Sequence, residues 1–327
     1  MESEAVQTAA VENGEATARS GSAGTMTFLG DDPRPFTYIL DGFAFYPMPP
    51  PTLSTSWDVH IDDLKQMQLR DDDLFILAYP KAGTHWLWEV TSMLLQGKAE
   101  YDSRPKEELM VEFTDLNKLE KTPAPRIFNS HLPFHMLPWQ QMKEKRTKIL
   151  HVYRNPKDSC VSYYHHLNVF DDTPIHDMAF NDFCELFFSG RLPLDNYFWH
   201  MKQFTTFSQE NPDVPVLSLS FEDMKKSPTE NIKRLATFLE VDVDDKLCED
   251  IADACSFKKL KKGAEIKKVW CDYPENENKE KKQTRIEFYR KGEIGDWKNY
   301  FTVAMSEKMD AVIKERMEGL PYGLQYS

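Results

Sequence analysis

The chain has 327 residues and a formal net charge of −13, with 41% hydrophobic and 13% aromatic residues. This content is enough to bury a large core in one domain or two closely fused lobes. The acidic balance argues against nucleic acid or an anionic membrane as the main partner, because both favour a basic surface. No stretch approaches the ~18 apolar residues that a membrane-spanning helix needs.

Residues 1–24 are rich in Ala, Glu, Ser, Gly and Thr and contain almost no large apolar side chains. Because such a segment buries too little surface to offset the entropy lost on ordering, we expect residues 1–24 to be a disordered N-terminal tail. The segment lacks both the apolar core of a secretory signal and the Arg-rich pattern of a transit peptide. Residues 25–327 are expected to form the folded domain.

Five cysteines are spread over the chain, and no two of them form a C-x-x-C pair. An odd number without paired spacing favours free thiols over a disulfide framework. Free thiols are typical of a reducing compartment, so we expect a cytoplasmic protein.

Prolines are frequent between residues 31 and 60 and end in the run Pro47-Met48-Pro49-Pro50-Pro51. Proline removes backbone donors and favours extended polyproline geometry, so we interpret this stretch as a rigid connector without regular elements. The aromatic residues just before the run could belong to the core or could wall a ligand pocket. They are Phe43, Phe45 and Tyr46.

Residues 74–97 have the pattern of a strand, a small loop and a helix. An apolar run breaks at Pro80, and apolar residues then recur at helical spacing until Gly97. Backbone N–H groups at the helix start, the Thr84 hydroxyl and the Lys81 ammonium can converge on one anionic group. The lysine precedes the glycine, unlike in a Walker A loop, which disfavours an ATP or GTP hydrolase. Taken alone, the segment could equally be an ordinary turn with a solvated lysine.

Two later segments, residues 126–131 and 148–153, also have strand patterns. His131 stands at the exit of the first. The second leads into Arg154-Asn155-Pro156, in which the asparagine can cap a helix that begins at the proline. Arg154 therefore follows the carboxyl end of a strand, where open α/β sheets bind ligands. Ser162, about two turns into that helix, could face the same crevice.

A further strand, residues 214–219, leads to Ser227-Pro228-Thr229-Glu230, a capping box that opens a helix to about residue 240. Strands thus alternate with helices along the chain. This alternation predicts a single α/β domain with a central, largely parallel β-sheet flanked by helices and joined by right-handed crossovers.

The stretch from Lys258 to Lys291 is locally rich in Lys and Arg. It could be a solvated surface of mixed charge or a basic flap that closes over an anion. The sequence offers no convincing metal site, because His131 and His135 are separated by Pro133 and no H-E-x-x-H motif is present.

Together these motifs resemble the cytosolic sulfotransferase family, whose members use 3′-phosphoadenosine 5′-phosphosulfate (PAPS). Four stretches carry the resemblance, in the order typical of the family: Tyr79-Pro80-Lys81-Ala82-Gly83-Thr84-His85-Trp86, Asn129-Ser130-His131-Leu132-Pro133, Tyr153-Arg154-Asn155-Pro156-Lys157-Asp158 through Tyr163, and Arg290-Lys291-Gly292-Glu293-Ile294-Gly295-Asp296-Trp297-Lys298. The similarity spans about residues 35 to 320.

The resemblance implies a PAPS site built around a P-loop-like 5′-phosphosulfate loop. That loop comprises Lys81, Ala82, Gly83, Thr84 and His85, with Lys81 reaching the bridging oxygen. Adenine contacts are implied for Trp86 and Phe257, and ligands of the 3′-phosphate for Arg154, Ser162, Arg290, Lys291 and Gly292. Phe221 and Cys255 occupy further positions of this site, where Tyr and Thr are more usual in the family.

The resemblance also implies that His131 is the catalytic base and that the acceptor is a small phenol, sterol, alcohol or amine. An imidazole with a pKa near 6.5 suits removal of a hydroxyl proton, and sulfuryl transfer otherwise needs positioning and charge stabilisation, without a metal. Candidate acceptor contacts are Phe43, Tyr46, Pro80, Asn129, Phe134 and Tyr163. Residues 298–307 resemble the family's dimerisation segment, K-x-x-x-T-V-x-x-x-E, which implies a possible homodimer.

Asn129 departs from the family pattern, in which lysine is common at this position. Lys81 is then expected to be the only cation near the transferring group, and Asn129→Lys is expected to increase turnover. Two alternatives remain open: a protein that binds PAPS or its product without efficient transfer, and a P-loop nucleotide-dependent kinase.

Overall fold

The computed structural model describes residues 8–10, 24–50, 52–170, 173–176, 178–194, 196–267 and 289–324. Its strands are β1 (Thr8–Ala10), β2 (Thr25–Phe28), β3 (Pro35–Leu40), β4 (Phe43–Phe45), β5 (Leu74–Leu77), β6 (Ile127–Ser130), β7 (Lys148–Tyr153) and β8 (Val216–Ser220).

The α-helices are α1 (Trp57–Lys65), α2 (Thr84–Gln96), α3 (Leu116–Lys121), α4 (Trp139–Glu144), α5 (Pro156–Leu167), α6 (Phe180–Ser189), α7 (Tyr197–Glu210), α8 (Phe221–Lys226), α9 (Pro228–Leu239), α10 (Asp245–Ala254), α11 (Phe257–Lys267) and α12 (Val303–Met317). Three short 3-10 helices are η1 (Lys106–Leu109), η2 (Phe134–Met136) and η3 (Asp296–Asn299). Within these described ranges, none of the helices has the length and apolar character required to cross a membrane.

The central sheet has four strands in the order β6-β5-β7-β8, and each neighbouring pair is parallel. The predicted parallel sheet is therefore confirmed. Because the chain runs from β5 to β6 on one side and later to β7 on the other, the strand order reverses between β5 and β7. Ligands of open α/β sheets bind outside the carboxyl ends of the strands at such a reversal.

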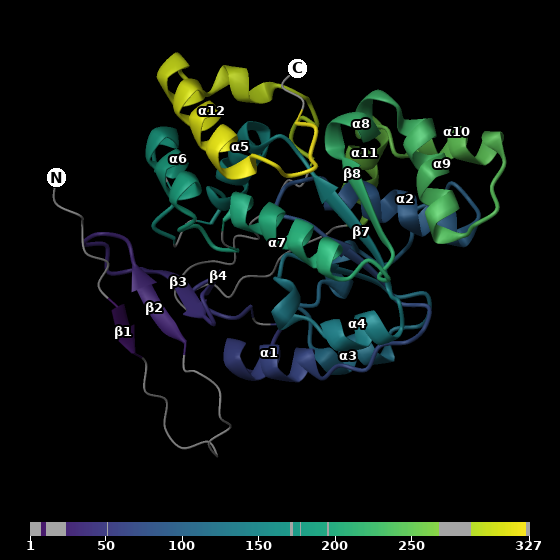
Figure 1. Ribbon diagram of the computed structural model, residues 1–327, viewed down its shortest axis with the longest axis horizontal. Coiled ribbons are helices and arrows are strands. Elements are labelled where there is room, and N and C mark those ends of the chain that lie inside the picture. The colour runs from purple at the N-terminus through teal and green to yellow at the C-terminus, as the bar shows by residue number, and fades with distance from the viewer. Residues whose placement is uncertain are drawn as a thin grey trace.

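Helices cover both faces of this sheet (Figure 1). Along β5, Phe75 and Leu77 pack into one core cluster with side chains of α1, α4 and α7. Leu74 and Ile76 point the other way, into a cluster with α2, α9 and α10. A third cluster joins α5, α6, α7 and α12. Burial on both faces explains why β5 is a continuous apolar run. Apolar and polar residues alternate only in strands of a sheet that has one face exposed to solvent.

A second, antiparallel sheet of four strands in the order β1-β2-β3-β4 lies at the left of Figure 1. The prediction of a connector without regular elements over residues 31–60 is therefore wrong, because β3, β4 and α1 occupy much of it. Asp41 and Gly42 join β3 to β4 with φ of 48° and 79°. Two residues at positive φ make a tight hairpin, and an Asp-Gly pair between apolar runs is its usual signal. The prolines of residues 47–50 lie outside the strands.

Residues Thr8–Ala10, inside the predicted disordered tail, form β1 and pair with β2. This pairing differs from the expectation for these three residues. The rest of residues 1–23 lies outside the described residues, so the tail and the domain boundary at residue 25 stay predictions.

Both helix starts predicted from capping residues are confirmed, but only one of the two predicted caps forms. The Asn155 side chain accepts hydrogen bonds from the N–H groups of Lys157 and Asp158, and α5 begins at Pro156. Ser227 precedes α9, but its side chain makes no capping hydrogen bond, so the predicted capping box does not form. Its carbonyl instead accepts a hydrogen bond from the Asn231 side chain, 3.0 Å away.

A buried ion pair joins the starts of β5 and β6. The Arg126 Nε donates to Asp73 Oδ1 at 2.7 Å, and the two side chains are 1% and 0% exposed. We expect Asp73→Ala to lower the free energy of unfolding by about 3–5 kcal/mol, because it leaves the guanidinium buried without its carboxylate. Urea denaturation followed by circular dichroism measures the change.

Asp71→Ala is the matched control, because Asp71 is 91% exposed and pairs with Lys145 at the surface. Exposed ion pairs contribute little, so this variant should unfold at the wild-type urea concentration. Equal losses in the two variants would contradict the role given to the buried pair.

Candidate active site

A cavity of about 1300 Å³ opens at the carboxyl ends of the parallel strands. A residue after each strand lines this cavity: Lys81 after β5, His131 after β6, Arg154 after β7 and Phe221 after β8. The sheet thus brings together residues from four separate segments. Lys81 and Arg154 flank the reversal of strand order, which is where this fold class binds ligands.

The loop between β5 and α2 has a backbone suited to an anion. Lys81 has a φ of 66°, and Gly83, before the first turn of α2, has a φ of 116°. Both values lie in the left-handed region, which a lysine adopts only at a cost. A Cβ on Gly83 would also lie 2.8 Å from the Phe221 ring. The loop therefore requires glycine there and presents the N-terminus of a helix to the cavity, with Thr84 at its first position.

Cations surround the Lys81 ammonium. Burial and the positive charges of Lys106 and Arg154 lower the pKa of Lys81 to about 7, and Arg290 adds to this effect. The pocket therefore concentrates positive charge in a region of low dielectric. An anion bound among these groups would relieve their repulsion and restore the proton on Lys81.

His131 is positioned by two hydrogen bonds at the exit of β6. Its Nδ1 lies 2.7 Å from the Ala78 carbonyl oxygen, and its backbone N–H donates to Glu112 at 2.8 Å. Because a carbonyl only accepts, Nδ1 carries the proton and Nε2 has the lone pair. Burial and the Lys106 charge lower the pKa of His131 to about 3. The ring is therefore neutral near pH 7, and its Nε2 is unprotonated.

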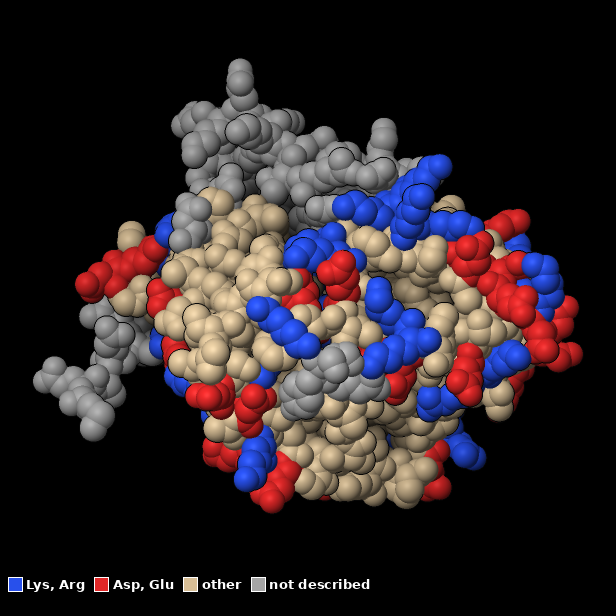
Figure 2. Space-filling view, turned by 90° about the horizontal axis from the view of Figure 1, so that it is seen from above, with Lys and Arg blue, Asp and Glu red and all other residues tan. Residues whose placement is uncertain are grey.

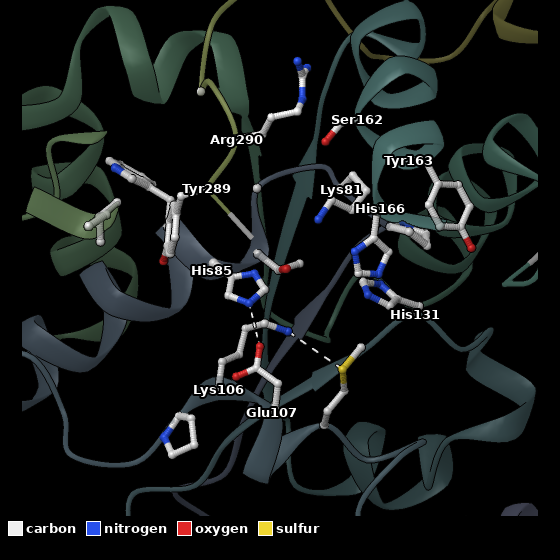
Figure 3. Close-up of a pocket in the computed structure, with 18 of the residues that line it drawn as sticks. Lys81, His85, Lys106, Glu107, His131, Ser162, Tyr163, His166, Tyr289 and Arg290 are labelled. Atoms are coloured by element: carbon white, nitrogen blue, oxygen red, sulfur yellow. Dashed lines mark hydrogen bonds and ion pairs between the residues drawn. The ribbon is translucent and has the colours of Figure 1, made fainter. Parts of the chain in front are cut away.

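The His85 side chain turns toward the 3-10 helix η1 (Figure 3). Its Nε2 lies 2.6 Å from Glu107 Oε1. Burial lowers the pKa of His85 to about 4. For Glu107 burial acts to raise the pKa, but His85 and Lys106 hold it at about 2. At neutral pH the ionised Glu107 therefore accepts from a neutral His85, which leaves mainly the backbone of His85 to face an anion in the loop.

Arg154, Ser162 and Arg290 also line the cavity, and Arg154 donates from Nη1 to the Lys81 carbonyl at 3.4 Å. The Arg154 guanidinium lies 4.4 Å from the centre of the Phe221 ring and donates from Nη2 to the Glu293 carbonyl at 2.9 Å. Its Nε is buried and has no hydrogen-bond partner in the described structure. A donor held in this way suits an anionic ligand.

The residues around Arg290 are fixed by an acidic anchor. Asp296 pairs with Arg290 at 2.5 Å and with Lys291 at 2.7 Å, although both cations line the cavity. Of the basic stretch from Lys258 to Lys291, residues 268–288 lie outside the described residues, so the proposed flap is not tested there.

Several aromatic side chains line the cavity near the start of α2. Trp86 donates from Nε1 to the Cys255 carbonyl at 2.9 Å, which fixes its ring. A Cβ added to Gly292 would lie 2.3 Å from the Phe257 ring. Position 292 therefore requires glycine, which lets the backbone pass this close to the ring. Tyr289 lines the same region. This arrangement suits a planar ring system.

Not every predicted site residue lines the cavity. Tyr46, Pro80 and Tyr163 do. Ala82 packs in the core instead, as do Phe43 and Phe134. The Phe134 ring stacks on Phe207, with centroids 3.5 Å apart.

Asn129, a predicted acceptor contact, also lies outside the cavity lining. Its side chain is buried and donates to the Ile127 carbonyl at 3.1 Å. Lys106 does line it, so the expectation that Lys81 is the only cation near this part of the pocket is wrong.

Sequence reasoning missed several lining residues, namely Lys106, Glu107, His165, His166 and Tyr289. Lys106, Glu107 and Tyr289 stand in segments without a strand or helix pattern. His165 and His166 lie near the end of α5, where no local signal showed that they face the cavity. In the described part of the chain, no three His, Cys, Asp or Glu side chains gather as a metal site.

Basic side chains gather near the middle of the molecular face in Figure 2, whereas many acidic side chains lie along its edges. The chain as a whole has a net charge of −13. More Lys and Arg than Asp and Glu side chains line the cavity. Its local charge is therefore opposite in sign to the total charge, and clefts of this kind attract anionic ligands.

The model of a family described as "Sulfotransferase domain" matches residues 71–321. Sulfotransferase 1B1 of Canis lupus familiaris is 32% identical over 281 residues, which cover 82% of this chain and 90% of that protein. Sulfotransferase 1A1 of Mus musculus is 33% identical over 274 residues, which cover 80% of this chain and 90% of that protein.

Among solved structures, mouse sulfotransferase SULT7A1 complexed with PAP has a TM-score of 0.66 and 28% sequence identity, covering 86% of this chain and 94% of that one. The family model covers more than half of the chain, and the two curated relatives exceed 30% identity over most of it. The chain therefore belongs to the sulfotransferase family and is a transferase.

Proposed function

We propose that the protein moves the sulfuryl group of PAPS to a hydroxyl, or an amine, of a small acceptor. The observation that carries this proposal is one cavity in which Lys81, Arg154 and Arg290 surround the start of α2 and in which His131 presents a neutral Nε2. The related mouse enzyme is complexed with PAP, 3′-phosphoadenosine 5′-phosphate, which is what remains of PAPS once its sulfuryl group has been transferred. This complex supports the choice of donor.

The pocket residues fit PAPS. The loop amides and Lys81 suit the 5′-phosphosulfate, and the unpartnered Arg154 Nε suits the 3′-phosphate. Trp86 and Phe257 line the part of the cavity that suits adenine. Tyr46 and Tyr163 line the cavity too and would contact the acceptor.

In the proposed reaction His131 removes the acceptor proton at Nε2, while its Nδ1–H stays on the Ala78 carbonyl. Bound PAPS supplies the sulfuryl group, whose sulfur leaves the 5′-phosphate oxygen and bonds to the acceptor oxygen. The Lys81 ammonium stabilises negative charge on the departing phosphate. A cavity of about 1300 Å³ has room for both partners, and their alignment in line is the main requirement of such a transfer.

We also propose a cytoplasmic protein that forms a homodimer through residues 298–307. The four described cysteines, Cys160, Cys184, Cys248 and Cys255, are free thiols, as suits a reducing compartment. Val303 is 75% exposed at the start of α12. An apolar side chain this exposed suits a small contact between two copies.

Lys81→Ala should leave a folded protein whose turnover with PAPS and a phenol is at least about 100-fold lower, because one electrostatic stabiliser of the developing charge is removed. A stopped assay with sulfur-labelled PAPS measures the rate. Lys98→Ala is the control, since Lys98 is exposed and pairs with Glu100. Wild-type turnover in the Lys81 variant would contradict the role.

The same lysine predicts the sign of a pH effect. Its pKa is about 7 in the free protein, and a bound anion raises it. At pH 8 the binding of PAP should therefore take up a proton at Lys81, and affinity should fall as pH rises above about 7. Calorimetry in two buffers of different ionisation enthalpy measures this uptake, which Lys81→Ala should abolish.

His131→Ala should abolish measurable transfer to hydroxyl acceptors while PAP binds with the wild-type affinity, because the base touches the acceptor and not the nucleotide. Titration calorimetry and the labelled assay separate the two effects. His135→Ala is the control, because His135 is exposed on η2 and does not line the cavity. A parallel loss of binding and activity would make His131 a structural residue.

Val303→Glu should convert a dimer into an active monomer, because it places a charge in the centre of a small apolar contact. Sedimentation velocity at micromolar concentration measures the mass. Met48→Glu is the control, since Met48 is also an exposed apolar residue, at 64%, but lies outside the segment. A wild-type protein that sediments only as a monomer would refute the dimer.

A further inference from the structure

Lys106 is an almost fully buried lysine that lines the cavity. It begins η1 and is 4% exposed, yet it belongs to the wall that Lys81 and His131 also form. Lysines are rarely buried unless their charge has a task or a counter-charge. Figure 3 shows its amine pointing into the pocket, on the side where His85 and His131 lie. The Lys106 Nζ lies 3.9 Å from the Met110 sulfur.

The fold explains how a residue of this segment reaches the reaction centre. After η1 the chain runs beside β6: Met110 forms a parallel bridge with Asn129, and the Val111 N–H donates to the Asn129 carbonyl at 3.0 Å. His131 follows two residues later along that chain. The bridge therefore holds η1 against the carboxyl end of β6, where the Lys106 side chain enters the pocket.

The charge of Lys106 acts on both groups that the proposed reaction uses. After burial, it is the largest cause of the lowered pKa of His131 and of Lys81. Asn129, the neighbour across the bridge, is neutral and turns its amide to the Ile127 carbonyl. Lys106 is thus a cation near both His131 and the loop between β5 and α2, but it belongs to a third segment, η1.

We propose that Lys106 is a catalytic residue whose ammonium binds the sulfuryl oxygens during transfer, beside Lys81 and opposite the loop amides. This inference rests on the proposed use of PAPS. Charge grows on these oxygens as the bond to the departing phosphate breaks, and a preorganised buried cation stabilises it strongly. Lys106 then does from η1 what a lysine at position 129 would do, which removes the reason to expect faster turnover from Asn129→Lys.

A structural role is the competing explanation, because two buried carboxylates, Glu107 and Glu112, lie near Lys106 and feel its charge. Glu107 is ionised at neutral pH and also accepts from His85, and Glu112 accepts from the His131 backbone. Burial raises the pKa of Glu112 to about 7, so Glu112 is only partly ionised at neutral pH. A counter-ion role would make the loss of Lys106 disturb folding and nucleotide binding alike.

The test compares Lys106→Met, which keeps the length and removes the charge, with Lys106→Arg, which keeps the charge. Single-turnover rates with sulfur-labelled PAPS and a phenol should fall about 10- to 100-fold in the methionine variant, the effect of losing one charge-assisted hydrogen bond. The arginine variant should recover a substantial part of the rate. The affinity for PAP should stay within about threefold of wild type, because PAP lacks the sulfuryl group.

Lys98→Met, a change at an exposed lysine, should leave rate and affinity unchanged. If the wild-type protein itself transfers nothing from PAPS, the proposed function fails. If the wild type transfers and Lys106→Met is as fast, the inference about Lys106 is overturned while the function stands. If Lys106→Met loses PAP affinity and rate together, or if Lys106→Arg gives no recovery, Lys106 is structural.

Discussion

Repulsion among the cations that line one pocket is the constraint on which the site depends. Lys81, Lys106, Arg154 and Arg290 act on one another strongly enough to lower the pKa of Lys81 to about 7, with burial as the larger cause. Like charges in a region of low dielectric separate unless the fold fixes them. Asp296 fixes Arg290, and the Phe221 ring and the Glu293 carbonyl fix Arg154. The remaining positive charge favours an anionic ligand.

The sheet supplies the rigidity that this arrangement requires. Each parallel strand ends at the same edge and delivers one functional residue, so four distant segments meet without long loops. At the other end of β5 and β6, the Asp73–Arg126 pair is fully buried. Strain such as the positive φ of Lys81 persists only where the surroundings are fixed in this way.

Much of this arrangement could be predicted from the sequence, because its signals are local. The apolar run of β5, the break at Pro80 and the cap at Asn155 each lie within a few residues of the element they specify. The hairpin at Asp41-Gly42 had a local signal as well, but the neighbouring prolines obscured it. Lys106 had none, because its place depends on the bridge between Met110 and Asn129, which no short-range pattern encodes.

The absence of a lysine at position 129 and the burial of Lys106 nearby are connected by simple electrostatics. A pocket that already holds Lys81 and Lys106 beside His131 would gain a further repulsive charge from a lysine at position 129, which would depress the pKa of each neighbour again. A neutral amide that satisfies the Ile127 carbonyl avoids this cost. Asn129 is therefore consistent with a site that has enough positive charge without a lysine at position 129. A bound anion responds to the total electric field in the pocket, whichever segment of the chain supplies the charges.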